Sequence, residues 1–288
     1  MQHTKFIITL ILLIQWITPL SAAPAEFVAA SESDFAHPHD IALDPSGKFL
    51  LVSDMQNDVV RVINPQSLKT ISTIGEGELS SPHDVSFDSQ GRLLVADSGN
   101  NRIVIFEFNN GSGTVISSIA ENMRSPEGVC ADSDGHIYVA STGNHTILKF
   151  KNNKLIKRIG GRGKNKAQFI RPHDIEMSAD GLLYVSDPGN NRIQILSDAL
   201  VPIEIIQPKS KPLNEPKYLA LDKQGHVFIA DQHNNLLRIF DHQRNEIHAI
   251  SKANHKTLNN IEGVEYVDGK LWIADTYNNR IVLFHWTP

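Results

Sequence analysis

Three histidines at corresponding positions of a repeating unit are the residues of this sequence most suited to metal chemistry. His39, His83 and His173 each stand in the middle of a Pro-His-Asp triplet. Neutral imidazole is a common metal ligand, and three histidines with one open position suit a catalytic Zn²⁺ ion. The sequence therefore predicts that these three residues bind Zn²⁺ or another divalent metal, provided that their rings point to one place.

Carboxylates occupy two of the other corresponding positions. In chain order the six residues are His39, His83, Glu127, His173, Lys217 and Glu262. A carboxylate close to a bound ion could carry a proton, so Glu127 and Glu262 are candidate catalytic residues. A structural interpretation stays open, since Pro-His-Asp could simply begin a strand, with each histidine hydrogen-bonded to a neighbouring loop.

These residues belong to a unit that is repeated six times. Each unit has the triplet, an apolar strand, a glycine turn, a second apolar strand, Asp, and then Asn and Arg or a substitute. The middle residues of successive triplets are 44, 44, 46, 44 and 45 positions apart. Strand-length apolar runs such as 41–43, 49–52 and 59–63 indicate about four strands per unit. The sequence predicts an all-β, six-bladed propeller with one four-stranded blade per repeat.

The two ends of the chain are expected to complete one blade together. The sixth unit stops just after its third strand, 281–286, and the segment 27–30 stands where a preceding fourth strand would be. Pairing of the two ends hides open sheet edges, whereas an open solenoid would leave both ends uncapped. Residues 26–288 are therefore predicted to form a single closed propeller, which is expected to be a monomer.

Residues 1–25 have the pattern of a secretory signal peptide. Lys5 precedes an apolar run of 15 residues, 6–20, and small residues follow it at 21–23. This run is shorter than the roughly 20 residues of a membrane-spanning helix, which disfavours an uncleaved anchor. We expect cleavage near residues 22–25, a secreted or periplasmic protein, and no membrane association after cleavage.

The amino-acid composition excludes some structural features and disfavours some partners. The 288 residues are 41% hydrophobic, which is enough for a sizeable core, and the single cysteine, Cys130, excludes an internal disulfide. With 27 basic and 32 acidic residues, the chain is not expected to bind nucleic acid. The basic tract 164–166, in a glycine-rich loop, is interpreted as a solvated excursion that could contact an anionic partner.

A second set of carboxylates is expected deeper in the propeller. Glu176 and Glu265 stand at innermost-strand positions where four other units have small residues, namely Ala42, Ser86, Cys130 and Ala220. Carboxylates in a crowded centre need water, a cation or a partner. One hypothesis is a second ion in the channel, of the oxygen-liganded Ca²⁺ type.

The strings VADSGNNRI at 95–103 and IADTYNNRI at 273–281 resemble the NHL repeat. This resemblance covers about residues 27–288 and implies a six-bladed propeller. NHL propellers include protein-binding and RNA-binding modules and a secreted zinc enzyme, the peptidyl-hydroxyglycine amidating lyase. Similarity to that lyase implies zinc on His39, His83 and His173, and Tyr277 could match its rim tyrosine.

The chain also departs from that lyase. The lyase takes its histidines from alternate blades, whereas here they come from the first, second and fourth. The positions of its rim arginine hold other residues: Met55, Ser98, Thr142, Pro188, Gln232 and Thr276. Arg171, just before the fourth triplet, is the nearest cation. The resemblance therefore supports a zinc site more strongly than it supports that reaction.

Two classes of function follow from these observations. The first is a metal-dependent lyase or hydrolase that acts on a small molecule at the face where the innermost strands begin. The second is a non-catalytic scaffold that binds a protein, peptide or glycan across the same face, with Tyr218, Tyr277 and Trp286 as exposed aromatic residues. The repeated Asp is expected to be structural, because five units share it.

Overall fold

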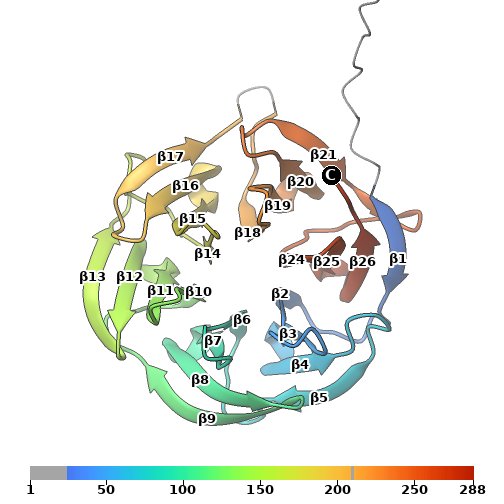
Figure 1. Ribbon diagram of the computed structural model, residues 1–288, viewed down its shortest axis with the longest axis horizontal. Helices are drawn as coiled ribbons and strands as arrows, with labels where there is room; N and C mark the ends of the chain where they lie inside the picture. The colour runs from blue at the N-terminus through green and yellow to red at the C-terminus, as the bar shows by residue number, and fades with distance from the viewer. Residues whose placement is uncertain (1–24, 209–210) are drawn as a thin grey trace, which may run out of the picture.

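The computed structural model describes residues 25–208 and 211–288, and the predicted signal peptide lies outside them apart from Ala25. Six four-stranded antiparallel sheets stand as blades around a central axis, which confirms the predicted propeller (Figure 1). No helix in the described ranges is long and apolar enough to cross a membrane.

The blades follow one another in chain order, and each runs from the axis outwards. Blade 1 contains β2 (Pro38–Leu43), β3 (Leu50–Asp54), β4 (Val59–Ile63) and β5 (Thr70–Ile74). Blade 2 contains β6 (Pro82–Phe87), β7 (Leu93–Asp97), β8 (Arg102–Asn109) and β9 (Ser112–Ile119). Blade 3 contains β10 (Pro126–Ala131), β11 (His136–Ser141), β12 (Thr146–Lys151) and β13 (Lys154–Gly160).

The second half of the ring repeats this arrangement. Blade 4 contains β14 (Ile175–Met177), β15 (Leu182–Asp187), β16 (Arg192–Ser197) and β17 (Pro202–Ile206). Blade 5 contains β18 (Pro216–Leu221), β19 (Val227–Asp231), β20 (Leu236–Phe240) and β21 (Glu246–Ile250). Blade 6 contains β24 (Val264–Val267), β25 (Lys270–Asp275) and β26 (Arg280–His285). A small hairpin, β22 (Lys252–Ala253) and β23 (Lys256–Thr257), lies between blades 5 and 6.

The N-terminal strand completes blade 6, as the repeat pattern predicts. β1 (Glu26–Ala30) pairs antiparallel with β26, and Phe27 lies opposite Phe284 in the ladder. Figure 1 shows β1 outside β26, next to the C-terminus. At the same junction the Trp272 indole N–H donates to the carbonyl of Pro65 in blade 1, at 2.9 Å. The ring is therefore closed by backbone pairing as well as by side-chain contacts.

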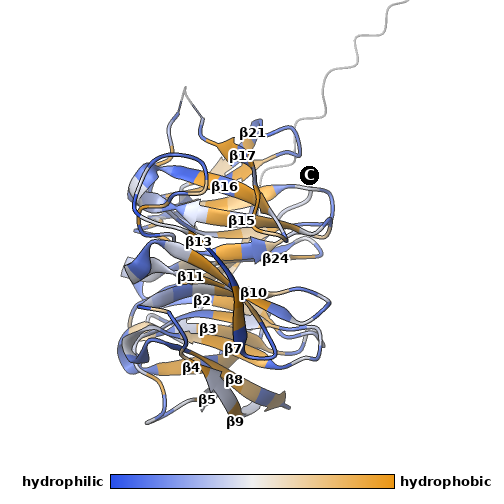
Figure 2. Ribbon diagram, turned by 90° about the vertical axis from the view of Figure 1, so that its left-hand side faces the viewer, coloured by the Kyte–Doolittle hydropathy of each residue, from blue (hydrophilic) through white to orange (hydrophobic). Residues whose placement is uncertain are grey.

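The hydrophobic core consists of separate layers, each packed between two neighbouring blades. Six clusters of buried apolar side chains occupy the six junctions between neighbouring blades. Figure 2 shows apolar strands through the body of the ring and polar loops at its two faces. Because each sheet buries both faces against its neighbours, its inner strands read as nearly continuous apolar runs.

A short 3₁₀ turn follows the second strand of every blade. The six turns are η1 (Met55–Asn57), η2 (Ser98–Asn100), η3 (Thr142–Asn144), η4 (Pro188–Asn190), η5 (Gln232–Asn234) and η6 (Thr276–Asn278). The residue after each turn is left-handed, with φ between 53° and 58°, and it is Asn in four blades. Asn tolerates this conformation better than most residues, which explains the repeated Asn.

The repeated Asp before that turn is a buried structural anchor. It accepts a backbone N–H from the preceding inter-blade loop at 2.7–2.8 Å and a guanidinium N–H at 2.5–3.1 Å. In blade 3, Ser141 replaces it and accepts the N–H of Arg124, and Thr146 stands where three other blades have the arginine. The acid and its cation are thus present together or absent together, which confirms the structural interpretation.

Candidate functional site at the mouth of the central channel

The first strand of each blade begins at one face of the ring, and the triplets lie at this start. We call this face the top face. In blades 1, 2, 3 and 5 the strand begins at the proline of the triplet. In blades 4 and 6 the ladder begins later, but His173 N–H still donates to Ser186 O and Glu262 N–H to Ala274 O. In the other four blades the ladder pairs the proline and then skips the middle residue, so His39, His83, Glu127 and Lys217 lie in a bulge next to the axis.

The three predicted histidines come together at the channel mouth. The ring centroids of His39 and His83 are 4.5 Å apart, and those of His83 and His173 are 6.2 Å apart. Three imidazoles that bind one ion at about 2.1 Å with tetrahedral angles would have centroids about 5 Å apart. The two separations lie on either side of this value, so the His83 ring is close to both other rings.

Each histidine has one ring nitrogen beside an oxygen atom. His39 Nδ1 is 3.1 Å from Glu262 Oε2, and His173 Nε2 is 3.3 Å from Glu127 Oε2. His83 Nδ1 is 2.8 Å from the carbonyl oxygen of Ser81. The two carboxylates predicted as site residues therefore lie next to two of the histidines. A hydrogen bond from one ring nitrogen to an oxygen is usual behind a metal-binding histidine, whose other nitrogen binds the ion. Of the three contacts only that of His83 is a hydrogen bond, since His39 Nδ1 and Glu262 Oε2 are buried without a hydrogen-bond partner.

The ring nitrogens of the three histidines do not point to one common position. Among the residues that the structure describes, no group of three or more His, Cys, Asp or Glu is placed to hold a metal ion. The donor set therefore fits a divalent ion in chemical type, and binding would require the rings to rotate until their nitrogens face one point. The buried Nδ1 of His173 has no hydrogen-bond partner, so its rotation would break no such bond there.

Burial sets the protonation of this cluster. His39, His173 and Glu262 are almost fully buried, whereas His83, Glu127 and Lys217 are partly exposed. Burial, together with neighbouring histidines and Lys217, holds the pKa of His39 and of His173 well below the usual value. Burial raises the pKa of Glu262 to about 7, although Lys217 opposes this shift. Neutral imidazoles therefore face a carboxyl group that can gain or lose a proton near neutral pH.

Two residues hold the site in a way that the sequence did not predict. The Gln232 amide donates to Glu262 Oε1 at 2.6 Å, from the turn of the preceding blade. The Tyr218 hydroxyl reaches across the channel to the carbonyls of His83 and Glu127, at 3.0 and 3.2 Å. Tyr218 also packs edge-on against His173, so it ties blade 5 to blades 2, 3 and 4.

The expectation of three exposed aromatic residues is wrong for two of them. Tyr218 and Trp286 are each 1% exposed, because one spans the channel and the other packs between blades 5 and 6. Tyr277 is 51% exposed on the top face. Its ring lies 4.8 Å from that of His37, which in turn lies 6.3 Å from that of His39. The His37 side chain therefore lies between Tyr277 and His39, and Tyr277 is at the outer edge of the predicted site.

Carboxylates of the triplets join successive blades further along the channel. The Oδ2 atom of each of Asp40, Asp84 and Asp174 accepts a backbone N–H of the next blade, at 2.7–3.2 Å. Glu265 accepts the N–H of Leu43 in the same way, at 3.2 Å, across the closing junction. Asp84 Oδ1 and Asp174 Oδ1 are buried without a hydrogen-bond partner. This part of the channel is therefore acidic and incompletely neutralised by the described residues.

Burial in this acidic channel predicts a pH-dependent stability. It raises the pKa of Glu265 to about 7, against a usual value of 4.5. The unfolded chain therefore ionises first, and the contribution of Glu265 to stability falls as pH rises from about 4.5 to about 7. Glu265→Gln keeps an acceptor for Leu43 and is expected to be more stable than the wild type at pH 8. Urea unfolding at pH 5 and pH 8, with a chelator present, measures this; parallel curves for the two proteins would contradict it.

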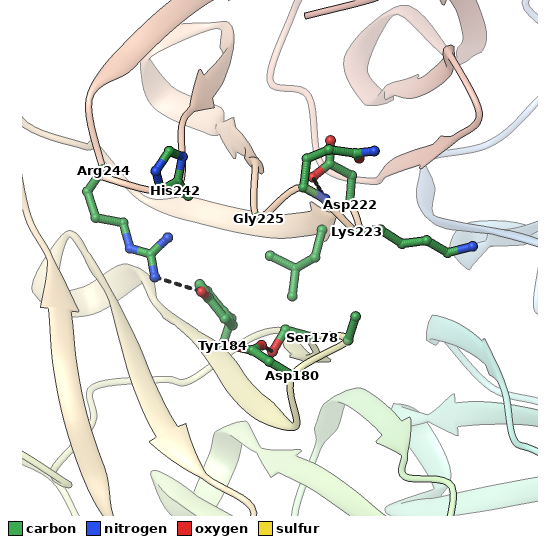
Figure 3. Close-up of a pocket in the computed structure, with 11 residues that line it drawn as sticks. Ser178, Asp180, Tyr184, Asp222, Lys223, Gly225, His242 and Arg244 are labelled. Atoms are coloured by element: carbon green, nitrogen blue, oxygen red, sulfur yellow. Dashed lines mark hydrogen bonds between the residues drawn. The ribbon is translucent and has the colours of Figure 1, made fainter.

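A separate pocket lies on the opposite face, between the turns of blades 4 and 5. It has a volume of about 440 Å³, and Arg244 there donates to the Tyr184 hydroxyl at 2.8 Å (Figure 3). None of the predicted site residues lines it. The side chains that could act together in a reaction thus lie at the channel mouth and not in this pocket.

Comparison with known proteins agrees with the fold. The NHL repeat model matches residues 79–106, 123–150 and 169–196, which correspond to blades 2, 3 and 4. The chain is therefore a six-bladed propeller that contains NHL repeats in these three blades. No curated protein matches it by sequence.

Solved structures extend the likeness to the whole ring. A catalytically inactive virginiamycin B lyase from Staphylococcus aureus, solved with quinupristin, has a TM-score of 0.66 at 12% identity, covering 89% of this chain and 97% of its own. A gluconolactonase from Xanthomonas campestris has a TM-score of 0.69 at 15% identity, covering 92% and 95%. An auxiliary nutrient binding protein from Bacteroides thetaiotaomicron has a TM-score of 0.69 at 13% identity, covering 88% and 70%. These identities show a shared fold alone.

Proposed function

We propose that this propeller is an exported enzyme, a lyase or hydrolase, whose site is the channel mouth and whose histidines bind one divalent ion, Zn²⁺ being the first choice. The observation that carries the proposal is the gathering of His39, His83 and His173, each with one ring nitrogen beside an oxygen. A lyase and a lactonase among the proteins of similar fold support an enzymatic role. Export rests on the leader pattern of residues 1–25.

The residues of the mouth have separate tasks in this proposal. A divalent ion, when bound, would act as a Lewis acid on a substrate oxygen. Glu262 holds or releases a proton at Oε2, because the pKa of its carboxyl group is raised to about 7 and Gln232 fixes the other oxygen. Glu127, which is more exposed, is a second proton carrier beside His173. Tyr277 stands at the outer rim, where it can contact the distal part of a substrate.

The channel mouth is nearly closed, which limits the size of the substrate. His39, His173 and Glu262 are at most 5% exposed, and Tyr218 blocks the channel beneath them. A small molecule, or one end of a peptide, can reach the partly exposed His83, Glu127 and Lys217. The carbonyls of His83 and Glu127 are held by hydrogen bonds from the Tyr218 hydroxyl, so little reorganisation is needed apart from rotation of the histidine rings.

Metal content tests the proposal without an activity assay. Purified protein supplied with Zn²⁺ is expected to retain about one ion per chain, and His83→Ala is expected to lose it. The exposed His285→Ala, on β26, serves as the matched control and should keep the ion. Inductively coupled plasma mass spectrometry gives the stoichiometry, and a chelator-sensitive melting temperature gives a second readout. A folded His83→Ala variant with undiminished metal would overturn the assignment.

The second candidate function is a non-catalytic scaffold that binds a protein, peptide or glycan on the same face. The exposed ring of Tyr277 beside His37 favours it, since an aromatic surface on a rigid rim is typical of recognition sites. Wild-type protein that binds no divalent ion at the mouth would favour this function over the enzyme.

We also propose a cation further down the channel, of the Ca²⁺ type. The unpartnered oxygens of Asp84 and Asp174 and the channel carboxylate Glu176 support it, since oxygen ligands suit this ion. Repeating the pH series on the wild type with calcium in place of the chelator tests it. Stabilisation above pH 7 is expected, and unchanged unfolding curves would contradict it.

A further inference from the structure

Basic residues are concentrated in one stretch of blade 3 and the loop after it. Residues 135–173 contain nine Lys or Arg and no Asp or Glu, which leaves 18 basic against 32 acidic residues in the rest of the chain. Six of the nine side chains are exposed along β13 and the loop 161–167: Lys154, Lys157, Arg158, Arg162, Lys164 and Lys166. We call these six residues the basic strip.

The basic strip is not neutralised by neighbouring acids. No carboxylate of the described ranges lies within ion-pair distance of any of the six side chains, and only Lys157 has a hydrogen bond, to the carbonyl of Ala199. An isolated cationic surface on a chain of net charge −5 is therefore available to an anionic partner.

The loop part of the basic strip is firmly held. The Arg192 guanidinium donates to the carbonyls of Lys164, Asn165 and Gln168 at 2.8–3.0 Å, from blade 4. The Asn190 amide donates to the Gly163 carbonyl at 2.9 Å, and Gly161 N–H donates to His145 O at 2.8 Å. The loop backbone is fixed on its inner side, and its lysine side chains are exposed. This is the arrangement of a rigid recognition loop rather than of a loose excursion.

Protection of a sheet edge does not account for these cations. Lysine on an outer strand can prevent edge-to-edge aggregation. However, the other five outermost strands, β1, β5, β9, β17 and β21, contain no Lys or Arg. Arg162, Lys164 and Lys166 also lie in the loop beyond the strand. A specific role of blade 3 is the better explanation.

The form of the basic strip indicates the class of partner. β13 runs along the outer wall of the ring (Figure 1), and its seven residues span about 23 Å. The two aromatic residues between 149 and 171, Phe150 and Phe169, are fully buried, so nucleic-acid bases have no stacking platform there. We propose that the basic strip binds a linear anionic polysaccharide, whose sulfate or carboxylate groups pair with cations of β13 and of the loop 161–167.

Heparin is the probe that tests this proposal. The wild-type protein is expected to be retained on immobilised heparin at about 50 mM salt despite its net negative charge, and to elute as salt rises. The variant Arg158→Gln/Arg162→Gln/Lys164→Gln/Lys166→Gln is expected to bind at least about tenfold more weakly. The control Lys48→Gln/Lys69→Gln/Lys223→Gln/Lys256→Gln removes as many exposed charges elsewhere and should elute with the wild type.

Competing polyanions provide the outcomes that would overturn the proposal. Wild-type protein that flows through heparin at low salt, or a control variant weakened as much as the strip variant, would refute the polysaccharide site. Equal or tighter binding to duplex DNA or to phosphatidylserine vesicles, lost in the strip variant, would assign the basic strip to that partner instead. Circular dichroism of both variants establishes that they are folded.

Discussion

Asp187→Ala is expected to destabilise the propeller by about 3–5 kcal/mol, because it leaves the buried Arg192 guanidinium without its carboxylate. Asp187 is fully buried, and it also accepts the backbone N–H of Ile170 and the side-chain amide of Asn190, at 2.7 and 2.8 Å. The free energy of unfolding, measured in urea, gives the effect directly.

Blade 3 supplies the matched control for this prediction. Ser141→Ala removes the equivalent acceptor, which is bonded to the backbone N–H of Arg124 and to no guanidinium, so no buried charge is left unpaired. We expect a loss of about 1 kcal/mol there. If Asp187→Ala costs no more than Ser141→Ala, the repeated Asp does not serve as the buried counter-ion described above.

Gly263→Ala is expected to destabilise the closing junction by about 3 kcal/mol or more, since the added methyl group would strike backbone atoms. Its Cβ would lie 2.8 Å from Asp40 Cα and closer still to the His39 carbonyl oxygen. Neither neighbour can move without shifting the strand that carries the site. Thermal or urea unfolding measures the loss.

Gly47 provides a comparison in which an added methyl group strains the backbone but clashes with no other atom. Gly47 has a φ of 70° in a turn, and a methyl group there would meet nothing within 4 Å. Gly47→Ala is therefore expected to cost about 1 kcal/mol, from the left-handed conformation alone. Equal losses for the two variants would mean that blades 6 and 1 can separate at little cost.

The repeat made the fold predictable. The regular period of the triplets, the apolar strand runs and the position of residues 27–30 are local signals, and the closed six-bladed ring follows from them. The closeness of His39, His83 and His173 was also predictable, since equivalent residues of a ring face a common axis. Their neighbours Glu127 and Glu262 followed from the same equivalence.

The rest depended on contacts between blades that a single repeat does not encode. Gln232 and Tyr218 each occur in one blade only, and the other five blades have other residues at these positions. No repeat pattern therefore indicates that Gln232 holds Glu262 or that Tyr218 crosses the channel. Tyr218 was wrongly expected at the surface for the same reason. Glycine in the third and sixth triplets is explained by the close approach of the next blade, which is visible only in three dimensions.

The channel-mouth site is tested most directly by anomalous diffraction from crystals of the protein supplied with Zn²⁺. One strong peak is expected at the zinc edge above Tyr218, within about 2.1 Å of a ring nitrogen of each of His39, His83 and His173. A map with no peak at the channel mouth, or with zinc bound only by residues elsewhere, would contradict it.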